Sequence, residues 1–195
     1  MESRLRAGWV FSGSGAGASR LKRPTRRAVG NDIREGDMSD SASGHSLLPA
    51  PGTYILWLHL EEPKRLRIGR LGVIAFDPGH YAYVGSAFGP GGIRARVGRH
   101  LRREKKKRWH IDYLNSASQP GGAWICYGDP PLEHRWARVL SSLTGAWLPA
   151  AGFGASDCRC PSHLIGFSKP PSLRIFLEKA DVMDRPVIRL GQICD

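Results

Sequence analysis

The chain has 195 residues, which is enough for one packed core with extensions at its ends. Hydrophobic residues make up 41% and charged residues 24%, as in ordinary globular proteins, so the composition excludes a mostly disordered chain. The formal net charge of +12 favours a polyanionic partner, usually nucleic acid, over a basic protein that is merely soluble. Because no apolar run approaches the ~20 residues of a membrane span, we expect no membrane partner.

The cysteines are too few for a disulfide framework in a chain of this size, and two of them are separated by a single residue. They are Cys126, Cys158, Cys160 and Cys194. This pattern predicts a reducing compartment. We therefore expect a cytoplasmic protein, associated with the nucleoid through its positive charge, with targeting to an organelle as the alternative.

The first 50 residues differ from the rest of the chain. They are rich in Gly, Ser, Ala and Arg, include a basic cluster at residues 20–27, and show no apolar period. A nucleic-acid-binding arm and an organellar targeting peptide are two interpretations of such a segment. We favour a disordered basic leader, because a targeting peptide also requires an amphipathic stripe, and Met38 is then an alternative start. Residues 51–168 form the predicted main domain, and residues 169–195 a C-terminal extension.

Three short segments of the main domain have the pattern of β-strands. From Gly52 to residue 60 almost every residue is apolar or aromatic, as in a strand covered on both faces. Residues 65–68 alternate charge with bulk, as a half-exposed strand does. Residues 81–85 form the third strand, with Tyr81, Tyr83 and Gly85 on one face. Tight turns between the three predict an antiparallel meander.

The rest of the domain alternates helices with short strands. A helix from about Ile93 carries a narrow apolar stripe with Val97 and Leu101, and a basic run follows it at residues 102–108. A second amphipathic segment begins at Trp109. Further predicted elements are a strand at residues 123–127, a helix that carries Glu133 and Trp136, a tight loop at 154–163, a strand at 164–167 and one more strand at 173–177.

Taken in order, these features resemble the GIY-YIG nuclease superfamily. The resemblance rests on Gly52-Thr53-Tyr54, then Tyr83-Val84-Gly85, then a helix with arginines, then a helix with Glu133. The strings "WHIDYL" and "SDCRCPSHL" resemble those of a subgroup known only as a domain of unknown function. The resemblance spans about residues 52–167. It implies an α+β fold in which a small three-stranded antiparallel β-sheet is flanked by helices.

The resemblance also implies a catalytic site. Tyr54 would act as or assist the general base, Tyr83 would position water or phosphate, and Arg96 would bind the phosphate, with His100 nearby. Glu133 would hold one divalent ion, Mg²⁺ or Mn²⁺, which a carboxylate with waters and substrate oxygens suits. A tyrosine has an ordinary pKa of ~10, so deprotonating it at pH 7 costs roughly 4 kcal/mol. We expect Arg96 and the bound cation to lower that cost.

The basic residues around the helix predict the contacts to phosphates. They are Arg94, Arg99, Arg102, Arg103, Lys105, Lys106, Lys107 and Arg108. Each predicted site residue also has a structural interpretation. The tyrosines suit half-buried strand positions, Arg96 suits a solvated helix face, and Glu133 near a helix start stabilises the helix dipole.

One departure from the superfamily concerns its late asparagine. The superfamily carries an Asn after the metal-binding Glu, whereas this sequence has no Asn after Asn115. Ser156, Asp157 or His163 is a candidate for that role. The absence puts the efficiency of catalysis in question, and catalysis itself.

Cys158, Cys160 and His163 form a compact group of thiolate and imidazole ligands, which favour Zn²⁺. Zinc requires four tetrahedral ligands, and only three lie close together in the sequence, so Cys126 or His110 would have to supply the fourth. Cys-x-Cys is also a less common chelating spacing than Cys-x₂-Cys. We favour the alternative that this segment, with Asp157, is a tight loop lining the site.

The sequence therefore predicts a metal-dependent endonuclease that hydrolyses DNA phosphodiester bonds, used in DNA repair or processing. The alternative is a catalytically weak nucleic-acid-binding module that keeps the fold and the basic helix. The preference for DNA over RNA comes from the resemblance alone, and the oligomeric state is not predicted.

Overall fold

The computed structural model describes residues 46–182 and 184–191, which belong to one unit of the chain, residues 43–195. Of the predicted leader, residues 1–45 lie outside the described part. Residues 46–50 are described and pack against the domain. The carbonyl oxygens of Leu48 and Ala50 accept hydrogen bonds from the first N–H groups of helix α1, those of Arg94 and Ile93. The folded unit therefore begins before Gly52.

The centre of the fold is a six-stranded antiparallel sheet with the strand order β6-β7-β4-β1-β5-β8. Its strands are β1 (Gly52–Leu60), β4 (Gly79–Ser86), β5 (Gln119–Tyr127), β6 (Ala146–Trp147), β7 (Leu164–Phe167) and β8 (Val187–Leu190). The prediction of an α+β fold with an antiparallel sheet is confirmed, but the prediction of three strands is wrong. The three long strands β4, β1 and β5 form the middle, and short strands extend both edges.

The predicted meander is also wrong. Strand β2 (Lys64–Arg67) pairs only with β3 (Val73–Phe76), around the 3₁₀ turn η1 (Gly69–Leu71), and this hairpin forms a separate two-stranded sheet. Strand β1 has nine residues, and its full-length partners are β4 and β5. A four-residue strand cannot satisfy that ladder. A local sequence pattern does not show which distant strands pair with each other.

Among the described residues there are four α-helices: α1 (Gly92–Leu101), α2 (His110–Ala117), α3 (Glu133–Ser141) and α4 (Leu173–Ala180). Helix α4 corrects the strand predicted at 173–177. The Ser172 side chain accepts a hydrogen bond from the Ile175 N–H as an N-cap, and the helix buries Phe176 and Ala180, which are four residues apart. None of these helices is long and apolar enough to cross a membrane.

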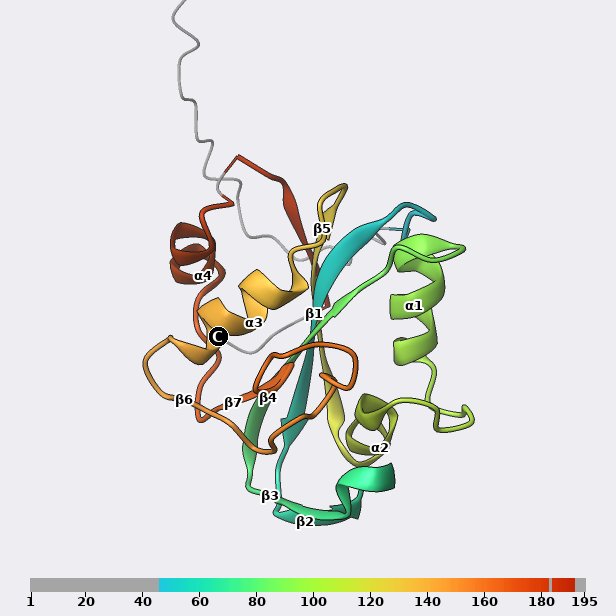
Figure 1. Cartoon of the computed structure of the whole chain (residues 1–195), viewed down its shortest axis with the longest axis vertical. Helices are drawn as coiled ribbons and strands as arrows, with labels where there is room; N and C mark the ends of the chain where they lie inside the picture. The colour runs from blue at the N-terminus through green and yellow to red at the C-terminus, as the bar shows by residue number, and fades with distance from the viewer. Residues whose placement is uncertain (1–45, 183, 192–195) are drawn as a thin grey trace, which may run out of the picture. The chain divides into compact units, whose positions relative to one another are not determined.

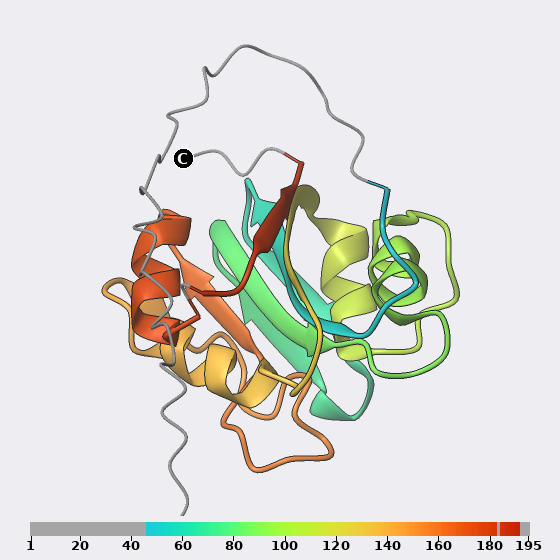
Figure 2. The same cartoon turned by 90° about the horizontal axis from the view of Figure 1, so that it is seen from above.

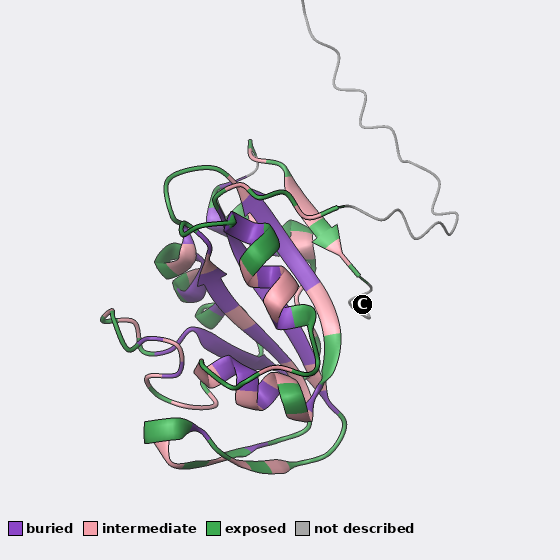
Figure 3. Ribbon diagram, turned by 90° about the vertical axis from the view of Figure 1, so that its right-hand side faces the viewer, coloured by how far each residue is buried: buried purple, intermediate pink, exposed green. Residues whose placement is uncertain are grey.

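Helices α1 and α2 lie on one face of the sheet and helices α3 and α4 on the other (Figures 1 and 2), with an apolar layer on each face. On one face Tyr54 and Leu56 pack with residues of α1 and α2, and on the other face Ile55 and Trp57 pack with residues of α3 and α4. Alternate residues of β1 therefore enter different layers, as the predicted strand with two covered faces requires. Figure 3 shows the resulting burial of the central strands. Helices α1 and α3 therefore lie on opposite faces of strands β1 and β4.

Candidate active site

A pocket of about 380 Å³ lies beside the end of strand β4. The ladder between β4 and β7 covers His80–Tyr83 of β4, and the next residues of β4, Val84 to Ser86, line the pocket. Several side chains predicted from the sequence meet there. They are Tyr83, Arg96, Arg108, His110, Glu133, Asp157 and His163.

Three elements on different sides of the sheet supply the polar walls of this pocket. Helix α1 contributes Arg96 from one face, and the first residue of α3, Glu133, reaches it from the other. Tyr83 comes from β4 between them. The side chain of Glu133 is 21% exposed, so its carboxylate is open to a ligand while its backbone is fixed by the helix. The structure thus brings together a tyrosine, a guanidinium and a carboxylate that are separated in the sequence.

Tyr54 and His100 do not line the pocket; they lie buried behind it. Tyr54 is the direct cross-strand partner of Gly85, which does line the pocket. A Cβ atom on Gly85 would come within 2.5 Å of the Tyr54 hydroxyl oxygen. The glycine of the Tyr83-Val84-Gly85 motif is therefore needed to make room for the tyrosine of the other motif. Gly52 is similarly close to a neighbouring strand, at the Cys126 carbonyl oxygen.

The hydroxyl of Tyr54 and the Nε2 atom of His100 are 2.9 Å apart and form a buried hydrogen bond. Burial, followed by the charge of Lys105, lowers the pKa of His100 to about 3, so its imidazole is neutral at neutral pH. The other ring nitrogen, Nδ1, has no hydrogen-bond partner in the described part of the chain and lies 3.8 Å from a carboxylate oxygen of Asp112. A proton on Nδ1, facing this anion, leaves Nε2 to accept the bond from Tyr54.

This buried imidazole makes folding sensitive to acid. The unfolded chain takes up the proton of His100 near pH 6.5, whereas the folded chain takes it up only near pH 3. Between these values the unfolded state binds more protons, so the contribution of His100 to the free energy of unfolding falls as the pH falls through that interval.

Asp112 is fully buried and is the anchor behind His100. Its carboxylate accepts hydrogen bonds of 2.9–3.0 Å from the Arg99 guanidinium and from the backbone N–H groups of Arg108 and Trp109. Burial acts to raise the pKa of Asp112, but these donors hold it below its ordinary value. The sequence analysis missed Asp112. The signal was an acidic residue three positions after Trp109, at a helix start next to a basic run.

The predicted effect of Arg96 on the tyrosines is outweighed by burial. Arg96 does act to lower the pKa of Tyr54, but burial and then the neighbouring Tyr83 raise it well above the ordinary value of 10.0. Burial likewise raises the pKa of Tyr83, against a smaller opposite effect of Arg96. Both tyrosines are therefore protonated in the resting protein, and the cost of forming a tyrosinate exceeds the value expected from the sequence.

The predicted phosphate-binding residues fall into two groups. Arg99 and Lys105 are occupied inside the domain: Arg99 binds Asp112, and Lys105 donates to the backbone carbonyls of Arg99 and His100. The others are exposed, at Arg94, Arg102, Arg103, Lys106, Lys107 and Arg108. Arg108 lines both the pocket beside β4 and a second hollow, formed by the segment from Arg99 to Arg108. Arg108 thus joins the pocket to a mainly basic surface formed by this segment.

Trp109 stacks with two arginines: Arg96, which lines the pocket, and Arg99, which binds Asp112. The guanidinium carbons of Arg96 and Arg99 lie 4.8 Å and 4.3 Å from the centre of its ring system. Stacking of this kind stabilises the cation and limits its rotamers.

The candidates for the role of the late asparagine, Ser156, Asp157 and His163, all line the pocket beside β4.

A second group of potential ligands lies next to the pocket. The ligand atoms of His134, Cys158, Cys160 and His163 all lie within 4.8 Å of one another, an arrangement that could hold a metal ion. The predicted fourth ligands do not join them. Cys126 is buried in the apolar layer beside α3 and α4, and the Nδ1 atom of His110 accepts a hydrogen bond from the Gly154 N–H. The fourth member of the group is His134, which was not among the residues predicted from the sequence.

Residues 53–183 match the family described as "Domain of unknown function DUF123". The chain belongs to this family. Comparison with curated proteins and comparison with solved structures each gave no match. The family description assigns no activity, so the function rests on the geometry of the site.

The close approach of Gly85 to Tyr54 can be tested with two glycine variants. In Gly85→Ala the new methyl group must displace the Tyr54 hydroxyl, and overpacking of this kind costs about 1–3 kcal/mol of folding free energy. Gly98→Ala in α1 is the control, because its methyl group meets no atom within 4 Å and alanine favours a helix by up to ~1 kcal/mol. Urea unfolding of both variants measures the difference. Equal stability of Gly85→Ala and the wild type would contradict the assigned packing.

Proposed function

We propose that this protein is a metal-dependent endonuclease of the GIY-YIG type that hydrolyses phosphodiester bonds in DNA. The observation that supports this most strongly is the convergence of Tyr83, Arg96 and Glu133 on one pocket, with the Tyr54–His100 hydrogen bond behind it. These residues come from three separate elements on two sides of a sheet. Each of them alone has an ordinary structural explanation, but the pocket brings their functional groups to one place.

The substrate's phosphate is bound by the cationic wall of the pocket. Arg96 provides a guanidinium held against Trp109, and Arg108 continues the positive surface outward to Lys106 and Lys107. A planar guanidinium suits the oxygens of a phosphate and stabilises the negative charge that grows in the transition state. The polyanion would therefore approach along the segment between α1 and α2 and place one phosphate beside β4.

The carboxylates of the pocket suit a divalent ion. Glu133 and Asp157 both line it, and they offer the hard oxygen ligands that Mg²⁺ and Mn²⁺ prefer. When bound, such an ion would relieve charge on the phosphate and lower the pKa of a coordinated water. Glu133 is the residue we assign to this role, because the start of α3 fixes its backbone at the pocket wall.

The Tyr54–His100 pair offers a route for the proton of the attacking water. The Tyr54 oxygen lies directly behind Gly85 of the pocket wall, where no side chain intervenes. The water would give its proton to this oxygen across the glycine while the tyrosine gives its own proton to Nε2 of His100, so that no free tyrosinate forms. The imidazolium produced would be stabilised by the nearby Asp112 carboxylate. With a pKa near 3 this cation is costly at pH 7, about 5 kcal/mol, and the negative charge of a bound phosphate would reduce that cost.

The main alternative is a nucleic-acid-binding module without useful catalysis. The absence of an asparagine after Asn115 and the raised pKa of Tyr54 favour it. Retention of Tyr54, Tyr83, Arg96 and Glu133 in one arrangement favours the nuclease. A role in DNA repair or processing follows from the superfamily alone.

Cleavage of supercoiled plasmid DNA, with Mg²⁺ or Mn²⁺ and with EDTA as the metal-free control, tests the proposal. Glu133→Gln should abolish cleavage and leave DNA affinity nearly unchanged. Tyr54→Phe keeps the ring but removes the hydroxyl, and loss of general-base assistance should lower the rate by ~10²–10⁴. Arg96→Ala should reduce both the rate and the affinity, because it contacts phosphate before and during the reaction. Glu178→Gln, on the exposed side of α4, is the control.

Two outcomes would contradict the proposal in different ways. A wild-type protein that binds DNA but never cuts it would favour the binding module. Cleavage that is equally fast in Glu133→Gln and Tyr54→Phe would show that the site lies elsewhere.

The basic surface predicts DNA binding that depends strongly on salt. If about five phosphates are neutralised, the logarithm of the association constant should fall with the logarithm of salt concentration at a slope of roughly −4 to −5. Replacing the exposed Lys106 and Lys107 by alanine should make the slope shallower by about 2, on all sequences alike. The matched control replaces Lys169 and Lys179, which lie outside the basic surface. A flat salt dependence in a fluorescence-anisotropy titration would contradict this interface.

A further inference from the structure

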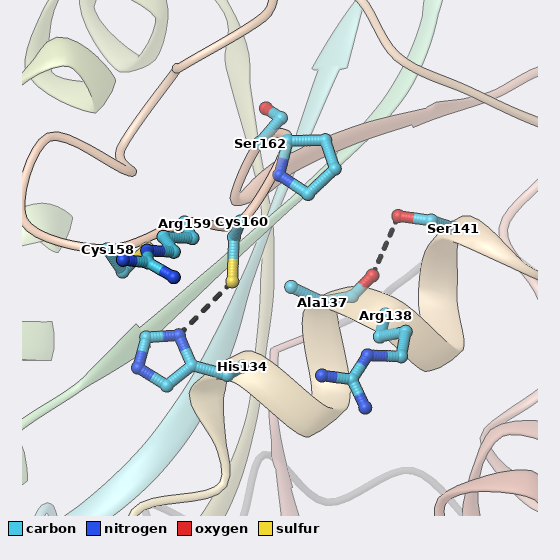
Figure 4. Close-up of a pocket in the computed structure, with 9 residues that line it drawn as sticks. His134, Ala137, Arg138, Ser141, Cys158, Arg159, Cys160 and Ser162 are labelled. Carbon is cyan, nitrogen blue, oxygen red and sulfur yellow. Dashed lines mark hydrogen bonds between the residues drawn. The ribbon is translucent and has the colours of Figure 1, made fainter.

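Two histidine–cysteine pairs face each other beside the pocket. The Nδ1 atom of His134 lies 3.2 Å from the Cys160 sulfur, and the Nε2 atom of His163 lies 3.4 Å from the Cys158 sulfur. Figure 4 shows the first of these contacts, with the His134 ring turned from α3 toward Cys160 on the neighbouring loop. All four ligand atoms lie within 4.8 Å of one another.

These distances are close to the edges of a zinc tetrahedron. With Zn–S bonds of about 2.3 Å and Zn–N bonds of about 2.0–2.1 Å, neighbouring nitrogen and sulfur ligands are about 3.6 Å apart and two sulfurs about 3.8 Å apart. The two nitrogen–sulfur pairs already have this spacing. None of the other separations exceeds 4.8 Å, so each has to shorten by at most about 1.4 Å, which side-chain rotations provide. The ligand set of two thiolates and two imidazoles is one that zinc prefers.

From these contacts we infer that His134, Cys158, Cys160 and His163 bind one zinc ion. The inference goes beyond the proposed function, because it concerns a separate site and holds whether or not the pocket cleaves DNA. Four protein ligands leave no open position for substrate, so the ion is structural. A single cysteine beside a histidine would suit a catalytic nucleophile. Here two such pairs lie together, with all four ligand atoms within 4.8 Å of one another, which suits a metal ion better.

The surroundings of His134 support its role as a ligand through Nδ1. Its other ring nitrogen, Nε2, lies 3.6 Å from a carboxylate oxygen of Glu133. Metal-binding histidines commonly direct their second N–H to a carboxylate, which fixes the tautomer and the orientation of the ring. In this arrangement the N–H of Nε2 faces Glu133, and the lone pair of Nδ1 faces Cys160 and the zinc.

The ion would fasten the loop of residues 154–163 to the first turn of α3. On one side of the loop, the backbone of His163 already bonds to Val84 of β4 and to Phe153. On the other side, His134 and Cys160 make the contact across to α3 that Figure 4 shows. Loop and helix both contribute to the pocket, through Asp157 and Glu133. Zinc thus fixes the relative position of two walls of the pocket without contacting the substrate.

The experiment is a metal analysis of the full chain, purified under thiol-protecting conditions from cells supplied with zinc. We expect close to one zinc per chain in the wild type. Cys160→Ser should lose the zinc and melt at a lower temperature, because metal binding contributes to folding. His134→Ala removes a half-exposed ligand and should leave the fold intact. Cys126→Ala, which removes a thiol outside the cluster, should keep its zinc and is the control.

A cobalt titration of the metal-free protein keeps the test decisive if Cys160→Ser fails to fold. Bound Co²⁺ should give the absorption of a tetrahedral thiolate site in the wild type and in Cys126→Ala. Binding should be at least about tenfold weaker in His134→Ala, since even partners of metal ligands cost that much. A wild type without zinc or cobalt binding would overturn the inference, and so would a His134→Ala variant that keeps wild-type metal content, cobalt affinity and melting temperature.

Discussion

The hydrogen bond between Tyr54 and His100 is the constraint on which the site depends. It is buried, it joins the central strand β1 to helix α1, and both of its partners are neutral at neutral pH. Several residues make this hydrogen bond possible. Gly85 leaves room for the hydroxyl, and the buried Asp112 faces the far side of the imidazole. Arg99 and two backbone N–H groups in turn stabilise the Asp112 carboxylate. Without that support a buried carboxylate would be protonated or would disrupt the core.

The structure also explains why part of the basic run is not free for DNA. Two of its cations stabilise the interior of the domain. Arg99 binds the buried Asp112 carboxylate, and Lys105 donates a hydrogen bond to the His100 carbonyl. Their exposed neighbours Lys106, Lys107 and Arg108 remain available for phosphates. The same short segment therefore stabilises the interior with one side and offers charge to a partner with the other.

Local sequence patterns predicted single strands and helices better than the pairing between strands. The strand at Gly52, the helix from Ile93 and the helix with Glu133 follow from periodicity, and all three are present. The meander failed because strand pairing is decided by distant partners, here β5 and β4. The pattern of residues 173–177 alone predicts a strand, because the second buried residue of helix α4, Ala180, lies beyond that segment.

Sequence motifs predicted only those site residues that are part of a motif. The motifs named both tyrosines, Arg96 and Glu133. Asp112 lies within the "WHIDYL" string, which gave it no role, and His134 lies in no motif. The contacts of both residues arise from tertiary proximity. His134 shows the limit most clearly. It lies 24 residues before Cys158 in the sequence, yet it completes the ligand group because α3 and the loop meet at the edge of β4. Glu133 and His134 are neighbours in the first turn of α3 and would serve the two proposed sites.

The central claim of this account is that His100 is a neutral acceptor for the Tyr54 hydroxyl, with its own proton on Nδ1. Nitrogen-15 NMR of the histidine side chains, followed from pH 7 to pH 5, tests it most directly, with His100→Gln to assign the signal. We expect a signal of the Nδ1–H tautomer that stays neutral throughout this range, since burial lowers the pKa of His100 to about 3. A His100 signal that titrates near pH 6.5, or that shows the proton on Nε2 at pH 7, would contradict it.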